Sequence, residues 1–239
     1  MMASDVLLSV DALDVFYGDF QALRQISFKV TKGTVVSVIG ANGAGKSTLL
    51  QTISGLQSHS TGKINFMGRD MTGSLPHQMV AEGLAMVPEG GRVFPKLTVS
   101  ENLIIGAYTP KARKKKDKLI RKVYDLFPVL QEKAHQLAGN LSGGQRQMLA
   151  IGRALMSDPQ LILFDEISLG LAPTVIKDIY RQIKVINQEG TTIVLVEQDV
   201  RRSLKASQAS YVMLEGSIIL SGNSSELVEE DVRKAYFGV

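Results

Sequence analysis

The stretch with the clearest chemistry is a glycine-rich run, GANGAGKS, at residues 40–47. An apolar run, 35–39, precedes it, and a segment with helical spacing of apolar residues follows. Glycines let backbone N–H groups approach a phosphate closely, and a following helix points its positive dipole end at the same anion. The spacing G-x-x-x-x-G-K-[ST] in this context predicts a nucleotide-phosphate site, with Lys46 on the β and γ phosphates and Ser47 on Mg²⁺. The residues predicted to hold the nucleotide here are Gly40, Asn42, Gly43, Gly45, Lys46, Ser47 and Thr48.

Two carboxylates follow a second apolar run, in LILFDE at residues 161–166. The run predicts a fully buried strand, and α/β sheets place their sites at the carboxyl ends of such strands. We expect Asp165 to bind Mg²⁺ and Glu166 to act as general base toward the attacking water.

A second glycine pair stands before a strongly helical segment, in LSGGQRQMLAIGRAL at residues 141–155. Ser142 is a good N-cap residue, so an ordinary helix cap accounts for the pattern by itself. A second helix N-terminus with bare N–H groups is also suited to an anion, and a further nucleotide would explain why one chain offers two.

A third apolar run, TTIVLV at residues 191–196, stops abruptly at Glu197, Gln198 and Asp199. The pattern is typical of a strand that delivers polar side chains to a site. An amide such as Gln198 donates and accepts hydrogen bonds but does not titrate near neutrality. This leaves Glu166 as the general base.

The elements that must position these residues alternate between helical and strand-like patterns along the 239 residues, which favours an α/β fold with a parallel sheet. We expect one P-loop NTPase domain over residues 1–239, with an antiparallel β portion near its start. Its core should comprise residues 1–94 and 159–239, and a mostly helical subdomain should occupy residues 95–158.

The charge and residue composition limit the kinds of partner that this chain can bind. The net charge is only +4, and much of the excess lies in KARKKKDKLIRK at residues 111–122. That run is a solvated helix face or a contact for anionic lipid, and without interleaved aromatic residues or a known nucleic-acid module we expect no nucleic-acid partner. There are no cysteines, the three histidines lack metal-ligand spacing, and no apolar run approaches the ~18 residues that span a bilayer.

GANGAGKST, LSGGQ and LILFDE, in this order, resemble the ATP-binding subunit of ABC transporters. The resemblance implies a head-to-tail dimer of two ATP-binding subunits that sandwiches ATP. It implies that Tyr17 stacks on adenine and that Gln198 contacts the γ-phosphate, where most of the family has His. Glu89 stands where most of the family has a Gln that senses Mg²⁺ and water, so it joins Ser47 and Asp165 as a metal ligand. The signature residues that close over the partner's ATP are Ser142, Gly143, Gly144 and Gln145.

Finer features are similar to the shorter ATPase subunit of branched-chain amino-acid importers: VPEGGRVFPKLTVSENL, SLGLAP, Gln198 and the ending VRKAYFGV. This implies two membrane permeases and an extracytoplasmic binding protein as partners, and a place on the cytoplasmic face of the cell membrane. Urea or amide import, lipopolysaccharide export and a non-transport ATPase stay open.

The same segments also depart from the family's pattern. Gly91 and Ile167 replace the Arg and Pro that are usual there, and we expect only a modest effect of Ile167. The apolar residues Val93, Phe94, Leu97 and Val99 could line a groove for a permease helix or belong to the core of the helical subdomain.

Overall fold

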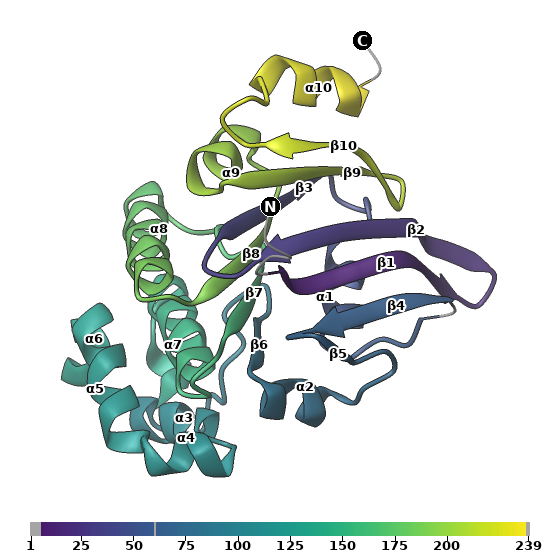
Figure 1. Ribbon diagram of the computed structural model, residues 1–239. Helices are drawn as coiled ribbons and strands as arrows, with labels where there is room; N and C mark the ends of the chain where they lie inside the picture. Colours follow the sequence, from purple (N-terminus) through teal and green to yellow (C-terminus); the bar gives the residue numbers. More distant parts are fainter. Residues whose placement is uncertain (1–5, 60, 238–239) are drawn as a thin grey trace.

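The structure, a computed structural model, describes residues 6–59 and 61–237 (Figure 1). The last two residues of the ending VRKAYFGV, and the first five of the expected domain, lie outside the described residues. Two β-sheets lie next to each other, and most of the helices gather beside one of them.

The first sheet is antiparallel, with strand order β2-β1-β4-β5. In β2 the buried side chains Ile26, Phe28 and Val30 alternate with exposed ones, as expected for strands that bury one face. The bounds of these strands are β1 (Val6–Tyr17), β2 (Phe20–Thr31), β4 (Thr61–Phe66) and β5 (Arg69–Asp70).

The second sheet has strand order β10-β9-β3-β8-β7-β6, with β9, β3, β8, β7 and β6 parallel and β10 antiparallel at one edge. Its strands are β3 (Val35–Gly40), β6 (Leu84–Val87), β7 (Leu161–Asp165), β8 (Thr192–Glu197), β9 (Ala209–Leu214) and β10 (Ser217–Asn223). Ile39 pairs with Glu197, and Asp165 pairs with Val196. The carboxyl ends of the three central strands therefore meet at one edge of the sheet.

The helices are α1 (Lys46–Ile53), α2 (Pro76–Glu82), α3 (Val99–Gly106), α4 (Pro110–Lys114), α5 (Lys116–Leu126), α6 (Pro128–Glu132), α7 (Gly143–Leu155), α8 (Pro173–Gln188), α9 (Val200–Ala206) and α10 (Glu229–Phe237), with a 3-10 turn at Ala138–Asn140. Helices α3 to α7 all lie between β6 and β7 in the chain and gather away from the antiparallel sheet (Figure 1). No helix within residues 6–59 and 61–237 has both the length and the apolar character needed to cross a membrane.

The core is divided by the parallel sheet. On one face Ile162 and Phe164 of β7 pack among side chains of α3, α7 and α8. On the other face Leu161 and Leu163 pack with α1 and the antiparallel sheet. Because β7 is buried on both faces, its sequence is apolar without alternation.

The arrangement confirms the expected α/β fold class, with its parallel core sheet, antiparallel portion and helical segment. The division of the chain at residues 94 and 159 stays a prediction, because the buried cluster that contains Phe164 runs without interruption from the sheet into the helices.

Candidate functional site

The glycine-rich loop connects β3 to α1, and its glycines are required for two different reasons. Gly43 has φ 81°, with open space where a Cβ would be, so only its backbone conformation demands glycine. A Cβ on Gly45 would lie 2.9 Å from the Ala22 carbonyl oxygen, and one on Gly40 would lie 2.9 Å from that of Met213. These two glycines let the loop lie directly against the neighbouring backbone.

Lys46 is the first residue of α1, and its side chain is 3% exposed. Its Nζ donates to the Ala41 carbonyl oxygen at 2.9 Å and lies 2.8 Å from Oε1 of Glu166. Within the described residues, no side chain caps the N-terminus of α1. The first-turn N–H groups are thus available to an anion, together with a buried ammonium group.

Ser47, Asp165 and Glu89 face a cavity of about 370 Å³ beside the loop. Ser47 Oγ donates to Asp165 Oδ1 at 3.0 Å. Burial raises the pKa of Asp165, and the charges of Glu166 and Glu89 raise it further, against the hydrogen bond from Ser47 and the charge of Lys46. A cation at this place would offset the crowding of negative charge.

The donor set fits Mg²⁺. A hydroxyl and two carboxylates are hard oxygen ligands, and Mg²⁺ takes few protein ligands while it keeps several waters. Over residues 6–59 and 61–237 no group of three acidic, histidine or cysteine side chains is close enough to cage a metal alone. The site therefore suits a cation that it shares with a phosphate.

Glu166 lies between Lys46 and Gln198. Gln198 Nε2 donates to Glu166 Oε2 at 2.6 Å and to Asn42 Oδ1 at 2.6 Å. The backbone of Glu166 has φ 42°, a strained value for this residue type, and its N–H donates to the Val196 carbonyl oxygen at 3.0 Å. The fold thus places the predicted base, the predicted γ-phosphate residue and the loop lysine in one hydrogen-bonded group.

Glu197 is a residue of this edge to which the sequence assigned no role. It is 2% exposed and accepts hydrogen bonds from Ser168 Oγ at 2.8 Å and Tyr180 OH at 2.9 Å. Burial raises its pKa, against these two hydrogen bonds and the charge of Arg202. Its carboxylate joins α8 to the loop after Glu166. An acid that ends a wholly apolar strand is the signal that could have found it.

Tyr17 ends β1 and is 44% exposed. The next strand, β2, borders the phosphate loop through Ala22 and Leu23, whose atoms lie under 3 Å from a Cβ built on Gly45. Stacking of the Tyr17 ring on adenine stays a prediction.

The signature residues Ser142, Gly144 and Gln145 lie at the start of α7, away from the cavity beside the phosphate loop. Ser142 Oγ accepts from the Gln145 N–H at 3.3 Å, and Gln145 Oε1 accepts from the Ser142 N–H at 3.0 Å, which forms a capping box on α7. Together with Gly144 they line a cavity of about 390 Å³ shared with α8, distinct from the one beside the phosphate loop. Gly144 is needed there, because a Cβ on it would lie 2.7 Å from Val175 Cγ1.

The apolar residues after Glu89 divide between the two interpretations. Val99 is fully buried in the core, and Val93 packs against it. Phe94 is 48% exposed, lies under the Arg153 guanidinium at 5.1 Å and lines a groove of about 390 Å³ with Tyr108 and other apolar side chains. Leu97 is half-buried, so Phe94 is the exposed one of these four side chains, and its contact with a permease helix stays a prediction.

Comparison with known proteins decides the family. The family described as ABC transporter matches residues 23–168, which contain the phosphate loop, the signature and the Asp165–Glu166 pair. The chain belongs to the ABC transporter family. It is an ATPase whose hydrolysis of ATP is coupled to transport, and its domain binds nucleotide. ATP-binding subunits of this family dimerise and work with membrane permeases.

Two curated relatives are similar over nearly their whole length. The chain is 45% identical to the high-affinity branched-chain amino acid transport ATP-binding protein BraG of Pseudomonas aeruginosa. The 235 aligned residues cover 97% of this chain and 100% of BraG. It is 36% identical to the probable branched-chain amino acid transport ATP-binding protein LivF of Archaeoglobus fulgidus, over 94% and 95% of the two chains.

Solved structures of ATP-binding cassettes from ABC transporters share the fold of this chain. A nucleotide-free ATP-binding cassette from an ABC transporter superposes with a TM-score of 0.83 at 29% identity, over 96% of this chain and 94% of that one. The structure of an ATP-binding cassette of an ABC transporter in its ADP conformation gives a TM-score of 0.81 at 30% identity, over 96% of this chain and 94% of that one.

Proposed function

We propose that this chain is the ATP-binding and hydrolysing subunit of an importer of branched-chain amino acids. The observation that carries the proposal is the 45% identity to BraG over 97% of this chain and 100% of that relative. Gln198 and the segment around Glu89 are further features of the same branch.

The proposed roles follow from the geometry. Lys46 and the first-turn N–H groups of α1 hold the β and γ phosphates, and Gln198 donates to the γ-phosphate. Ser47, Asp165 and Glu89 would hold Mg²⁺, which would neutralise negative charge on the phosphates when bound. Glu166 accepts the proton of the attacking water, because it is the carboxylate that both Lys46 and Gln198 contact.

The proposed assembly has a second ATP-binding subunit arranged head to tail, identical to this chain or different from it. Ser142, Gly143, Gly144 and Gln145 of one subunit would cover the phosphate loop of the other. In this chain Ser142, Gly144 and Gln145 line a cavity separate from the one beside the loop. Two permeases would contact the groove at Phe94, and a solute-binding protein would act outside the membrane. The chain would then lie on the cytoplasmic face of the cell membrane.

The decisive experiment is capture from native membranes with the Glu166→Gln chain and ATP–Mg²⁺. We expect two permeases and a second ATP-binding subunit to copurify, and less of them with ADP. Recovery of soluble proteins alone would refute the transport assignment. Reconstitution of the captured complex then compares labelled leucine with labelled urea; ATP-driven uptake of urea but not of leucine would favour an amide or urea importer instead.

A further inference from the structure

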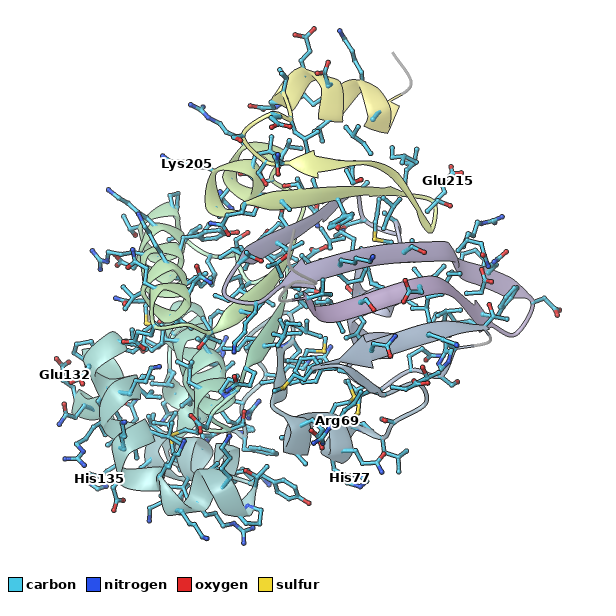
Figure 2. All side chains as sticks on the ribbon, in the orientation of Figure 1. Arg69, His77, Glu132, His135, Lys205 and Glu215 are labelled. Atoms are coloured by element: carbon cyan, nitrogen blue, oxygen red, sulfur yellow. The ribbon has the colours of Figure 1, made fainter. Side chains whose placement is uncertain are left out.

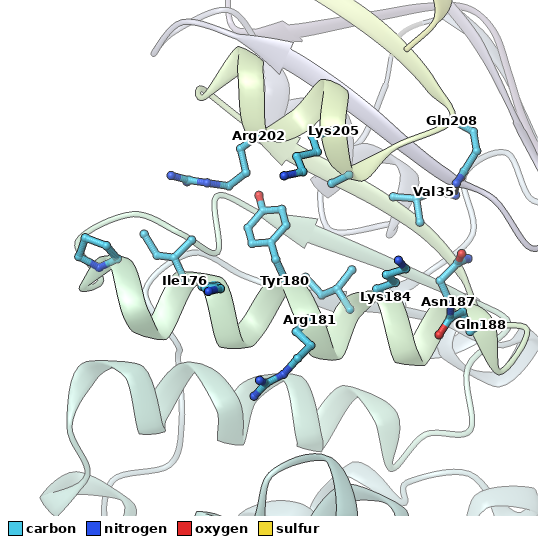
Figure 3. A pocket seen from close by; sticks show the side chains of 14 residues that line it. Val35, Ile176, Tyr180, Arg181, Lys184, Asn187, Gln188, Arg202, Lys205 and Gln208 are labelled. Atoms are coloured by element: carbon cyan, nitrogen blue, oxygen red, sulfur yellow. Dashed lines mark hydrogen bonds between the residues drawn. The ribbon is translucent and has the colours of Figure 1, made fainter. Parts of the chain in front are cut away.

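Helices α8 and α9 border a cavity of about 760 Å³ that shares no lining residue with the cavity beside the phosphate loop or with the groove at Phe94. Its floor is apolar, and Tyr180 extends from α8 toward α9 across it (Figure 3). This floor comprises the apolar lining residues Val35, Pro173, Ile176, Ile183 and Ala206. The volume falls in the range of about 300–1,000 Å³ that holds a small molecule instead of a folded partner.

The rim of this cavity is basic and includes no acidic residue. Arg181 is paired with Asp178 and points away from α9, and Arg202 is paired with Asp199 (Figure 3). The three lysines of the rim, Lys177, Lys184 and Lys205, have no carboxylate within 4 Å among the described residues. Three uncompensated ammonium groups above an apolar floor are complementary to an anionic group on an apolar body.

The cavity is physically connected to the ATPase site. Tyr180, which lies in the cavity under the Arg202 guanidinium at 5.7 Å, donates to Glu197 at 2.9 Å. Glu197 also accepts from Ser168, two residues after Glu166, and precedes Gln198 in the chain. A ligand that displaces the Tyr180 ring therefore acts on the two loops that carry the base and the γ-phosphate residue.

We propose that the cavity between α8 and α9 is a regulatory site for a small organic anion with an apolar body, and that its occupancy changes ATP hydrolysis through Tyr180. The lysines hold the anionic group and the apolar floor holds the body. The apolar body of this ligand is either an acyl chain or an aromatic ring. Dodecanoate and 1-naphthoate represent the two kinds of body.

Binding is measured by calorimetry on the purified chain with dodecanoate and with 1-naphthoate. Inorganic phosphate, which has no apolar body, and octyl glucoside, which has no charge, serve as control compounds. We expect one of the organic anions to bind at micromolar to millimolar concentration and the two control compounds not to bind. Lys184→Glu combined with Lys205→Glu should weaken binding by about tenfold or more, because two exposed attractions become repulsions.

The matched control is Lys111→Glu combined with Lys114→Glu on α4, which reverses the same charge at two exposed lysines outside the cavity. It should leave binding unchanged. Equal weakening in both double variants, or no binding of either organic anion to the native chain, overturns the site.

The regulatory half is tested by steady-state ATPase kinetics with the bound probe at saturation. We expect kcat or KM to change at least twofold in the native chain and not in Tyr180→Phe, which keeps the ring but loses the hydrogen bond to Glu197. Unchanged kinetics in the native chain, or the same change in Tyr180→Phe, overturns the coupling while the binding result stands by itself. Loss of ATPase activity in the absence of any probe would instead indicate failure of the nucleotide site.

Discussion

At the scale of single residues, the carboxyl edge of the parallel sheet carries a group of side chains that contact one another. Glu166 is 7% exposed, and its carboxylate contacts Lys46 with one oxygen and Gln198 with the other. Such a carboxylate is held in one direction by its neighbours, which suits the proposed role of a general base.

Replacement of Glu166 tests the general base. We expect Glu166→Gln to lower kcat by about 10²–10⁴-fold, the usual contribution of general acid–base catalysis, while ATP still binds. The measurement pairs ATPase turnover with equilibrium ATP binding. Glu215→Gln is the matched control, because Glu215 is also a glutamate with positive φ, at 46°, but is exposed. Turnover equal to that of the control would contradict the assignment.

Replacement of Gln198 tests the γ-phosphate residue. We expect Gln198→His to lose less than about tenfold in kcat, since one neutral hydrogen bond contributes about 1 kcal/mol. Imidazole titrates near neutrality and the amide does not, so a new pH dependence of kcat should appear near pH ~6.5. A dead Gln198→His enzyme would show that the amide does more than donate a hydrogen bond.

Replacement of Glu197 tests the buried carboxylate. Its pKa is raised in the folded chain, chiefly by burial, so the folded state binds the proton more tightly than the unfolded state. Stability from this group is therefore full below its unfolded pKa and falls as pH rises through the folded pKa, by about 1.4 kcal/mol per pH unit in between. Glu197→Gln should match native stability at low pH and exceed it increasingly as pH rises, in urea unfolding.

A stability difference between native and Glu197→Gln chains that does not vary with pH would contradict this. Ser168→Ala removes one donor but keeps the carboxylate, so it should keep the pH dependence.

At the scale of elements, the loop between β6 and α3 is fixed by its close approach to α7. A Cβ on Gly91 would lie 2.9 Å from the Gln147 backbone N and 3.0 Å from the Arg146 carbonyl carbon, and φ is 58°. A side chain at this position would therefore require the loop or α7 to shift. The loop thereby connects Glu89, at the cavity beside the phosphate loop, to the helix that begins at the signature.

Substitutions at two adjacent glycines distinguish the cost of backbone strain from the cost of steric crowding. Gly90 has φ 76° and open space around its Cβ position, whereas Gly91 has both strain and backbone contact. We expect Gly90→Ala to cost about 1 kcal/mol of unfolding free energy, from the left-handed conformation alone. Gly91→Ala should cost about 1–3 kcal/mol more, because the α7 backbone cannot yield. Equal costs in denaturant unfolding would show that the loop moves away freely.

At the scale of the whole molecule, one chain holds all the parts of an ATPase site but not in one place. The phosphate loop and Asp165 border one cavity, and Ser142 with Gly144 borders another on α7 and α8. Two chains arranged head to tail would bring these halves together, each chain completing the site of the other.

Pairing of the chains is tested by mass measurement in solution. We expect Glu166→Gln to form a pair with ATP–Mg²⁺ and to stay single with ADP, because hydrolysis no longer separates the subunits. Adding Ser142→Arg should abolish the pair by filling the place of the phosphate. Ser142→Thr, which keeps the capping hydroxyl, should still pair. A single chain with ATP throughout would exclude pairing of two copies.

The sequence by itself determined the parts that depend on local chemistry. The glycine spacing at residues 40–47, the apolar runs before Asp165 and Gln198 and the serine cap at Ser142 each follow from neighbours in the chain. Parallel pairing then brings three strand ends to one edge, so the meeting of Lys46, Asp165 and Gln198 was predictable as well.

Only the tertiary structure decided what depends on contacts between distant segments. Glu197 has its partners 29 and 17 residues away in the chain, so no local pattern shows that it joins α8 to the loop after Glu166. Phe94 and Val99 look alike in sequence, yet one faces a groove and the other the core. The place of Gly91 against α7 and the basic cavity at Tyr180 arise in the same way, because burial and electrostatic surroundings are set by segments that meet only in the folded chain.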